Sequence, residues 1–414
     1  MARMVQKFGG TSVGSVERIQ NVANRVAQTV AAGNQVIVVV SAMGHTTDEL
    51  IDLARQITPE PQAREMDMLL TTGEQISIAL LAMALQQKGI SAYSFTGWQA
   101  GIVTEPVHSK ARIMDIDPRR LIDTVASGSV AIVAGFQGWT IDREITTLGR
   151  GGSDTTAVAL AAAVQADVCE IYTDVDGVYS TDPRIVPFAR KIQEISYDEM
   201  LELAHLGAAV LHPRAVEYAK QYHVPLMVRS SFSQVEGTYV KEVAQMEKGL
   251  VVRGIAYDTN VAKVGLVGVP NRVENLKIVF QSLAKESINV DIIVQSIVQN
   301  DVGDISFTIT KDDRKRTMEI LEQLKDQIGA QAYVFEEDLA KVSIVGAGMI
   351  SNPGVAADMF QALIDHNIQI KMVSTSEIKV SCVIESGLAK QAMQILHTAF
   401  ALDAVQQHEE AAVV

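Results

Sequence analysis

A glycine-rich stretch in the middle of the chain has the composition of an anion-binding site. Residues 146–154 read TTLGRGGSD and run directly into a helical pattern over 155–166. The free backbone N–H groups at a helix start attract an anion, and the guanidinium of Arg150 suits a carboxylate or a phosphate. We therefore expect a small acidic ligand here. The alternative is an ordinary capped turn that follows a strand.

The amino terminus carries a second candidate site, for a phosphate. A predicted strand ends in a run of glycine and hydroxyl residues: Lys7, Phe8, Gly9, Gly10, Thr11 and Ser12. This run is not a Walker A loop, because its lysine precedes the glycines. Lys7 could neutralise a transferring phosphoryl group while the glycine amides hold its oxygens. Alternatively, Lys7 is a solvated lysine beside a surface turn.

Other polar loops follow apolar strands. Ser41 and Thr47 come after the strand predicted at 35–41, and Glu74 lies in a TTGEQ segment that we expect to open a helix. The strand predicted at 168–173 ends in a polar loop with Thr173, Asp174, Tyr179, Asp182 and Arg184. Ligands bind at the carboxyl ends of strands in open α/β sheets, so these loops are expected to share one site.

The composition excludes several classes of function. The chain has 414 residues, 48% hydrophobic residues and a net charge of −14, so we expect two or three domains and neither nucleic acid nor an anionic membrane as a partner. Cys169 and Cys382 lie in apolar runs and predict neither a disulfide nor a metal site. We expect a cytoplasmic protein, without a signal peptide and without an apolar run of roughly 18 residues that could span a bilayer.

The first part of the chain, 1–245, alternates predicted strands and helices. The strands are expected at 3–7, 35–41, 130–135, 168–173 and 224–229. The helices are expected at 15–32, 73–88, 154–166 and, interrupted by Pro213, within 194–219. This alternation predicts a three-layer α/β/α domain with a mostly parallel sheet.

The second part has a different order of elements. Residues 261–336 follow the order strand, helix, strand, strand, helix, strand, which is typical of a ferredoxin-like unit. Residues 340–402 repeat this order but stop one strand short, whereas a strand at 251–257 has no partner in the first unit. We infer that 249–258 completes the second unit, so that the first unit is inserted within it.

Taken together, these segments resemble the aspartokinases, enzymes with an amino-acid kinase fold and tandem ACT domains. The segments that carry the resemblance are KFGGTSVG at 7–14, SAMG at 41–44, TGE at 72–74, TTLGRGGSD at 146–154 and TDVDGVYSTDPR at 173–184. The similarity continues through the carboxyl half and is closest to the lysine-sensitive enzymes of Bacillus type. It therefore covers essentially the whole chain.

The resemblance implies an activity and a set of site residues. The reaction is transfer of the ATP γ-phosphate to the β-carboxylate of L-aspartate, the first step towards lysine, threonine, methionine and diaminopimelate. This nucleophile is ionised at pH 7, so no general base is needed. Lys7 is the expected catalytic cation, and Asp154 either orients it or simply caps a helix. The expected substrate-binding residues are Ser41, Thr47, Glu74, Arg150, Gly152 and Ser153.

ATP is expected against residues 7–12 and the second polar loop. Mg²⁺ would be held mainly by the phosphates, without a protein metal site or a tightly bound cofactor. The expected nucleotide contacts on that loop are Thr173, Asp174, Tyr179, Asp182 and Arg184, although Asp182 could instead cap the turn before Pro183.

The resemblance also implies regulation at the ACT domains by an amino acid, with lysine as the expected inhibitor. The expected effector residues are Asn289, Val290, Asp291, Ser374, Thr375, Ser376 and Glu377. We expect homo-oligomers through these domains or, if an internal start at Met246 is used, two large and two small chains.

Some positions depart from the family pattern. Ala209 stands where a lysine that contacts the nucleotide is common, and Asp176 stands where proline is common. The first ferredoxin-like unit lacks the Pro-Gly found in the second at Pro353 and Gly354, so the two units are expected to present effector amides differently. Two alternatives stay open: a kinase for glutamate or acetylglutamate, and an amino-acid sensor with a vestigial kinase domain.

Overall fold

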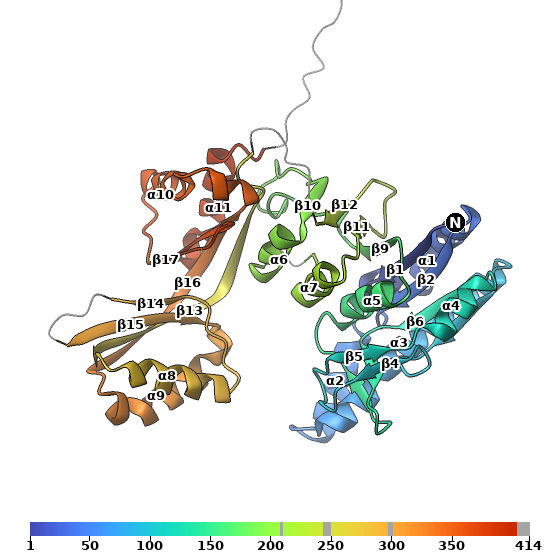
Figure 1. Cartoon of the computed structure of the whole chain (residues 1–414), viewed down its shortest axis with the longest axis horizontal. Coiled ribbons are helices and arrows are strands. Elements are labelled where there is room, and N and C mark those ends of the chain that lie inside the picture. Colours follow the sequence, from blue (N-terminus) through green and yellow to red (C-terminus); the bar gives the residue numbers. More distant parts are fainter. Residues whose placement is uncertain (208–209, 243–249, 297–300, 404–414) are drawn as a thin grey trace, which may run out of the picture. The chain divides into compact units, whose positions relative to one another are not determined.

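The computed structural model describes residues 1–207, 210–242, 250–296 and 301–403. The chain divides into two compact units. Figure 1 shows their helices and strands, coloured along the sequence. The first unit contains Met1–Tyr179 and Lys191–Glu247, and the second contains Ser180–Arg190 and Lys248–Val414. Each unit has its own sheet and its own apolar core.

The first unit is built on an eight-stranded sheet with the order β10-β12-β11-β9-β1-β2-β6-β3. All neighbouring strands are parallel except β11 and β12. The strands are β1 (Arg3–Phe8), β2 (Gln35–Val40), β3 (Ala92–Phe95), β6 (Val130–Ala134), β9 (Val168–Thr173), β10 (Glu194–Ser196), β11 (Leu226–Ser230) and β12 (Thr238–Lys241).

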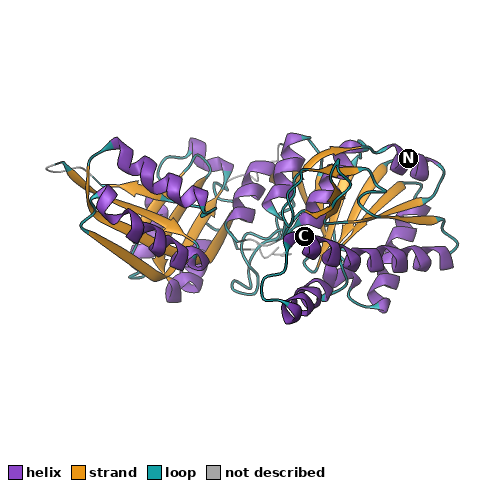
Figure 2. Ribbon diagram, turned by 90° about the horizontal axis from the view of Figure 1, so that it is seen from below, coloured by secondary structure: helices purple, strands orange, loops and turns teal. Residues whose placement is uncertain are grey.

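Helices cover both faces of this sheet (Figure 2). Val36, Val38 and Val40 of β2 pack in one core with α1 and α3, whereas Ile37 and Val39 face the side where α4 and α5 contact β2. The predicted α/β architecture is confirmed. The helices are α1 (Val16–Ala31), α2 (Thr46–Ile57), α3 (Ala63–Gln87), α4 (Arg119–Ala126), α5 (Gly152–Ala163), α6 (Tyr197–His205) and α7 (Pro213–Gln221).

A small four-stranded sheet in the same unit was not predicted. Its strands have only three or four residues each, too few for an alternating pattern to stand out. The order is β5-β4-β7-β8, and β8 leads directly into the glycine-rich stretch. The strands are β4 (Ile102–Thr104), β5 (Ile113–Ile116), β7 (Gln137–Trp139) and β8 (Ile145–Thr147).

Helix α3 differs from its prediction in two ways. It begins at Ala63 instead of residue 73, because its first turns carry charged and polar side chains that hide the helical pattern. It is also long and apolar enough, by length and composition, to cross a membrane, contrary to the expectation that no such run exists. However, Ile78, Leu81 and Leu85 lie in the protein core, and helices in protein cores can have the same length and composition.

The second unit has a six-stranded sheet with the order β14-β15-β13-β16-β18-β17. Helices α8 (Val273–Lys285), α9 (Arg314–Ile328), α10 (Val355–Asp365) and α11 (Ala389–Ala399) belong to this unit, together with a short 3-10 helix at Ala347–Ser351. The strands are β13 (Gly254–Pro270), β14 (Ile293–Gln295), β15 (Val302–Ile309), β16 (Ala332–Val345), β17 (Met372–Thr375) and β18 (Lys379–Glu385).

Two long strands run through the whole of this sheet. The segments predicted separately at 251–257 and 261–269 form one strand, β13, and those at 331–336 and 341–346 form β16. Their pairing shifts register around Asp258 and Val261, and polar residues at this irregularity suggested a loop in the sequence. Separate apolar cores lie on either side of the shift, one around Phe307 and one around Met359.

The segment Ser180–Arg190 groups with the second unit, although 1–245 was expected to be one domain. The backbone N–H of Ile255 donates to Ser180 O at 2.7 Å, and Gln394 Nε2 donates to Ile185 O at 3.1 Å. Ser180 Oγ also lies 2.8 Å from Nε2 of His397, a fully buried side chain. These contacts attach the segment to β13 and α11.

Truncation of Phe307 is expected to destabilise the second unit. Phe307 is fully buried and lies opposite Ile293 across β15 and β14, whereas Ile293 is 52% exposed. Phe307→Ala should lower the free energy of unfolding by about 3–5 kcal/mol through lost burial and the cavity left behind. Ile293→Ala is the matched control and should change it by less than about 0.5 kcal/mol. Urea unfolding measures both, and similar losses would contradict this assignment of the core.

Candidate active site

An ion pair joins the two glycine-rich segments of the first unit. Lys7, near the end of β1, places Nζ 2.6 Å from Oδ1 of Asp154, in the first turn of α5. The two side chains are only 11% and 13% exposed. An acid at a helix start is stabilised by the helix dipole. Asp154 is not the N-cap of α5, which is Gly151, so its carboxylate is available to orient the Lys7 ammonium.

The loop after β1 packs closely against the loop after β2. Gly44 N donates to Gly10 O at 3.0 Å, and a Cβ added to Gly10 would lie 2.9 Å from Ala42 O. Only glycine permits this approach without a shift of the backbone. Ser41 N donates to Phe8 O at 3.1 Å, which joins the two strand ends.

Within the first loop, the 3-10 helix at Gly10–Val13 and the exposed Thr11 fit a phosphate-binding role, whereas Phe8, Gly9 and Ser12 each have partners inside the protein. The Phe8 side chain is fully buried and stacks on Tyr172, with 4.6 Å between the ring centres, so it packs in the core at the start of the loop. Gly9 N already donates to Tyr172 O at 3.3 Å. Ser12 is also buried, and its hydroxyl lies 2.5 Å from that of Ser231.

Glu74 lies in the interior of α3, not near the start of a helix as expected, and is 3% exposed. Gly73 allows α3 to approach the loop after β2, because a Cβ there would lie 2.8 Å from Cβ of Ala42. Glu74 Oε1 accepts from Ala42 N at 3.1 Å, and Oε2 has no hydrogen-bond partner among the described residues. Burial raises the pKa of Glu74 to about 7. Such a carboxylate needs a cation or a donor beside it.

The turn between β8 and α5 holds Arg150 at the surface. Arg214 Nη1 donates to Leu148 O at 2.8 Å, which anchors the start of the turn. Gly151 has φ +68°, and a Cβ there would overlap the His212 ring. His212, which we interpreted as structural, caps α7 and packs against this turn, and burial lowers its pKa. Arg150 is exposed.

Gly152 and Ser153 continue the turn into α5. A Cβ on Gly152 would lie 2.8 Å from the Phe136 ring, so this glycine is required for packing. Ser153 is 8% exposed and lies against Gly135. Thr47 is in the first turn of α2, whose first residue, Thr46, also approaches Gly73.

The expected nucleotide residues are divided between the two units. Thr173 and Asp174 follow β9 in the first unit, and Thr173 Oγ1 donates to Asp174 Oδ1 at 3.0 Å. The hydroxyl of Tyr179 donates to Asp176 Oδ1 at 2.9 Å, and burial, with Asp176 beside it, raises the pKa of Tyr179 to about 12. Asp176, at a position where the family often has proline, therefore fixes this side chain.

Asp182 and Arg184 lie in the second unit and form an ion pair at 2.7 Å. Asp182 Oδ1 also accepts from Arg184 N at 2.9 Å, so this carboxylate stabilises the turn after Pro183. The hydrogen bond from Arg184 lowers the pKa of Asp182. Ala209 lies outside the described residues.

Sequence reasoning missed a buried polar network beneath the site. Glu170 of β9 is 3% exposed and accepts hydrogen bonds from Gln6 Nε2 at 2.7 Å, Tyr172 OH at 2.9 Å and Arg229 Nη1 at 2.9 Å. The guanidinium of Arg25 lies 4.9 Å from the centre of the Tyr172 ring. This network holds the ends of β1, β9 and β11 together. A charged residue within the apolar strand VCEIYT was the signal in the sequence.

In the second unit, an apolar cluster contains one residue adjacent in sequence to each expected effector segment. Ile292 and Met372 share this cluster with Leu339 and Val383. Asn289, Val290 and Asp291 precede Ile292. Ser374 and Thr375 end β17, and Ser376 and Glu377 form the turn after it.

Asp291 forms an ion pair with Lys341 of β16, whose side chain is 9% exposed. The Ser376 N–H donates to Lys379 O at 2.8 Å and closes the turn. The ion pair with Lys341 therefore fixes the position of the Asp291 carboxylate.

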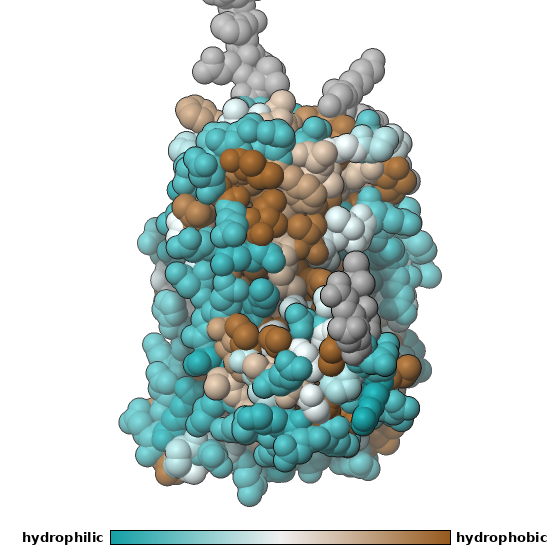
Figure 3. Space-filling view, turned by 90° about the vertical axis from the view of Figure 1, so that its left-hand side faces the viewer, coloured by the Kyte–Doolittle hydropathy of each residue, from teal (hydrophilic) through white to brown (hydrophobic). Residues whose placement is uncertain are grey.

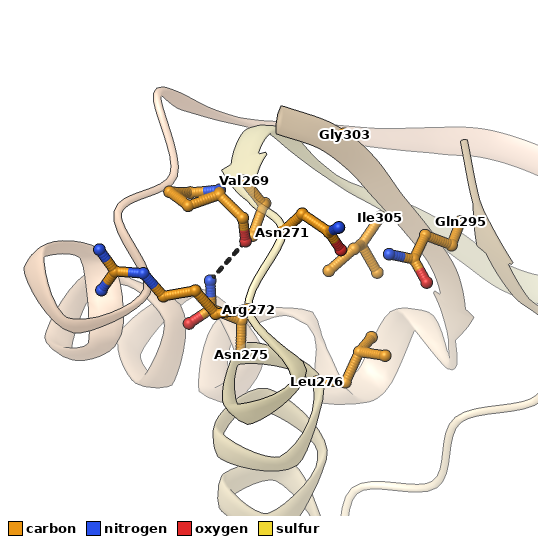
Figure 4. A pocket seen from close by; sticks show the side chains of 9 residues that line it. Val269, Asn271, Arg272, Asn275, Leu276, Gln295, Gly303 and Ile305 are labelled. Atoms are coloured by element: carbon orange, nitrogen blue, oxygen red, sulfur yellow. Dashed lines mark hydrogen bonds between the residues drawn. The ribbon is translucent and has the colours of Figure 1, made fainter. Parts of the chain in front are cut away.

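The two ferredoxin-like halves begin their first helices differently, as expected from the missing Pro-Gly. Helix α10 has Gly354 at its N-cap with φ +111°, whereas α8 has Arg272 there with φ −114°. A pocket lies beside the start of α8 (Figure 4). Asn275 in this pocket is 3% exposed and donates to Pro270 O at 2.9 Å and Ile328 O at 3.0 Å.

The sheet topology and the paired loops define the class of protein as an amino acid kinase joined to an ACT region. A model described as the amino acid kinase family matches residues 2–230, and one described as an ACT domain matches residues 342–400. The aspartokinase of Geobacillus stearothermophilus is 59% identical over 414 residues, which is 100% of both chains. Aspartokinase 2 of Bacillus subtilis (strain 168) is 58% identical over 97% of this chain and 98% of its own.

Solved structures of E. coli aspartokinase III are similar as well. The R-state complex with aspartate and ADP has a TM-score of 0.81 at 27% identity and covers 96% of this chain and 99% of that one. The T-state complex with lysine and aspartate has a TM-score of 0.74 at the same identity and coverage. The chain thus belongs to the aspartokinase family, and its activity is ATP-dependent phosphorylation of L-aspartate on the β-carboxylate, which opens the biosynthesis of lysine, threonine and methionine.

The buried carboxylate of Glu74 predicts a pH dependence of aspartate use. Its pKa of about 7 means that Glu74 loses its charge as the pH falls through neutrality. Glu74 is expected from the sequence to bind the ammonium group of aspartate, and only its ionised form could do so, so kcat/KM for aspartate should fall as the pH decreases through about 7. Glu74→Gln should have a higher KM and lack this fall.

Glu65→Gln is the matched control, since Glu65 is an exposed carboxylate on the same helix. It should retain the pH profile of the parent. An unchanged profile in Glu74→Gln would contradict the role of Glu74 in binding the ammonium group.

Proposed function

We propose that Lys7, Glu74 and the turn that carries Arg150 form the site where aspartate meets the γ-phosphate of ATP. The observation that carries this proposal is that the first unit contains both a buried carboxylate and a buried ammonium group. Within the part of the chain that the structure describes, Oε2 of Glu74 has no hydrogen-bond partner, and the buried ammonium of Lys7 pairs with Asp154. The first suits the substrate ammonium, and the second suits a phosphoryl group that gains charge in transfer.

In this mechanism, the β-carboxylate oxygen of aspartate attacks the γ-phosphorus of ATP. The bond between that phosphorus and the bridging oxygen breaks, which gives 4-phospho-L-aspartate and ADP. The attacking oxygen is already ionised, so the protein removes no proton. Its contribution is positioning and charge neutralisation, with Lys7 next to the transferred group.

Arg150 would bind the α-carboxylate of aspartate through a bidentate pair. Its exposed position, on a turn anchored by Arg214 and Gly151, supports this role. The other residues proposed to line the substrate are Ser41, Thr47, Gly152 and Ser153.

ATP would lie against the loop at 9–12 and against Thr173, Asp174 and Tyr179. Mg²⁺ would be held mainly by the phosphates of ATP, because it keeps much of its water shell and binds few protein ligands. Asp182 and Arg184 remain proposed nucleotide contacts. The complex of E. coli aspartokinase III with aspartate and ADP supports the use of both ligands.

For the second unit, we propose two ACT domains: residues 261–336, and residues 249–258 with 340–414. The pairing of 254–258 with 341–345 supports this division. The inhibitor would be lysine, which E. coli aspartokinase III binds in its T-state, and it would contact the segments on either side of the Ile292 and Met372 cluster.

Chains would associate through this unit, in the cytoplasm, as homo-oligomers or as two large and two small chains. The edge strand β14 supports association, because its residues Ile293 and Val294 are 52% and 42% exposed. Figure 3 shows apolar side chains gathered on a face of the molecule. Met246, the proposed internal start, lies outside the described residues.

Lys7→Ala should lower turnover by several orders of magnitude without loss of the fold, because water cannot replace a preorganised cation at the phosphoryl group. ADP release with aspartate as the substrate measures this, and the same assay with L-glutamate tests the specificity. Lys88→Ala is the control, since Lys88 is exposed at the end of α3. Activity of Lys7→Ala within tenfold of the parent would rule out the proposed role of Lys7.

L-Lysine should inhibit the full chain and release or absorb heat on binding, because an inhibitor must bind the inactive arrangement more tightly. Asp291→Asn should raise the lysine concentration that is needed for half inhibition. Calorimetry and ADP release on the same preparation test this, and D-lysine serves as a control ligand of equal charge. If L-lysine and D-lysine behave alike, the proposed effector is wrong while the kinase activity stands.

A further inference from the structure

A second buried carboxylate on α3, that of Asp67, is not explained by the site described above. Asp67 is 0% exposed and lies seven residues before Glu74 on the same helix, about 10 Å along its axis. Its carboxylate accepts from Thr147 Oγ1 at 2.6 Å and from Ser109 N at 3.1 Å to each oxygen. His108 Nδ1 lies 2.8 Å from Oδ2. All of these partners come from outside α3.

A carboxylate without exposure is costly in free energy unless its acceptor sites are filled. Here the hydroxyl, the backbone N–H and the imidazole fill them. The Asp67 carboxylate therefore holds two separate segments against α3: the end of β8 at Thr147, and the loop between β4 and β5 at Ser109.

These two segments lie on either side of the turn that carries Arg150. Thr147 is followed directly by Leu148, Gly149 and Arg150, and Ala111 N donates to Thr147 O at 2.9 Å. On the other side, a Cβ added to Gly149 would lie 3.1 Å from Ser109 O. Ser109 has φ +68°, a conformation that is uncommon for residues other than glycine and that the bond to Asp67 helps to maintain.

We infer that Asp67 is a positioning residue for aspartate binding. It fixes the turn that carries Arg150 relative to α3, the helix that carries Glu74. Because Arg150 and Glu74 would bind the α-carboxylate and the ammonium of one small molecule, the spacing between these two elements decides the affinity for aspartate. This inference rests on the proposed roles of Arg150 and Glu74.

A buried carboxylate with a structural role alone would affect stability and leave the ratio of the two Michaelis constants unchanged. A positioning role moves KM for aspartate and leaves KM for ATP nearly unchanged, since the nucleotide residues Thr173, Asp174 and Tyr179 are not among the contacts of Asp67. The two KM values therefore separate the two roles.

The test uses Asp67→Asn and Thr147→Val in the full chain. The asparagine oxygen can still accept hydrogen bonds, but the NH₂ group that replaces the second carboxylate oxygen can only donate. Thr147→Val removes the donor hydroxyl and leaves Asp67 in place. Each variant should raise KM for aspartate by about tenfold, the scale expected for misplacement of a binding group, and change KM for ATP by less than about twofold.

Glu65→Gln is the matched control, because Glu65 lies two residues before Asp67 on α3 and its side chain is 62% exposed. It should leave both KM values unchanged. Circular dichroism and thermal unfolding identify any variant that fails to fold, and Thr147→Val tests the inference if Asp67→Asn does not fold.

A double-mutant cycle with Arg150→Lys shows whether Asp67 acts through Arg150. Arg150→Lys alone should raise KM for aspartate, because an ammonium cannot form the bidentate pair. If Asp67 positions Arg150, adding Asp67→Asn to Arg150→Lys should raise this KM by less than Asp67→Asn does in the parent.

Each other outcome has one meaning. If Arg150→Lys raises the aspartate KM while Asp67→Asn and Thr147→Val do not, this inference alone is overturned. Fully additive effects also overturn it, because Asp67 would then act independently of Arg150. An unchanged aspartate KM in Arg150→Lys overturns the proposed role of Arg150 and this inference with it.

Discussion

The ion pair between Lys7 and Asp154 joins the end of β1 to the first turn of α5, and both side chains are almost fully removed from water. Such pairs seldom add much stability over apolar residues of similar size, because desolvation offsets their attraction. Here the pair places an oriented cation where two glycine-rich segments meet. Gly10 packs closely against Ala42, and Gly151 packs closely against His212. These contacts hold the two glycine-rich segments in positions that allow the ion pair to form.

Two side chains of opposite ordinary charge, Lys7 and Glu74, are both buried in the first unit but have different surroundings. Lys7 Nζ lies 2.6 Å from Asp154 Oδ1, whereas Glu74 accepts a hydrogen bond from Ala42 N and burial raises its pKa to about 7. The protein as a whole is acidic, with a net charge of −14, so it repels anionic ligands at long range. Anion binding therefore depends on local features: helix termini, Lys7 and Arg150.

The sequence was sufficient for the parts of the fold that depend on local pattern. Apolar runs such as 36–40 predicted the central strands, and glycines beside Lys7 and Arg150 predicted the loops that the structure brings together. Glu74 was predicted as a binding residue but not as a buried one, because its depth depends on contact between α3 and Ala42. Phe8 was assigned to the nucleotide, although its ring stacks on Tyr172 of the neighbouring strand β9, which is distant in sequence. Long-range contacts of this kind leave no periodic signal, and neither do three-residue strands.

The placement of Ser180–Arg190 in the second unit affects any smaller chain that begins at Met246. Such a chain would be the carboxyl-terminal unit without one of its own pieces. The N–H of Ile255 would lose its acceptor at Ser180 O, and His397 would lose the hydroxyl beside Nε2. A subunit made from that start would therefore lack part of its fold. The polar groups named above, Gln394 Nε2 and the apolar surface that Ile185 covers would become exposed. Water or another chain would have to satisfy them, so the short product would not be interchangeable with the same residues of the full-length chain.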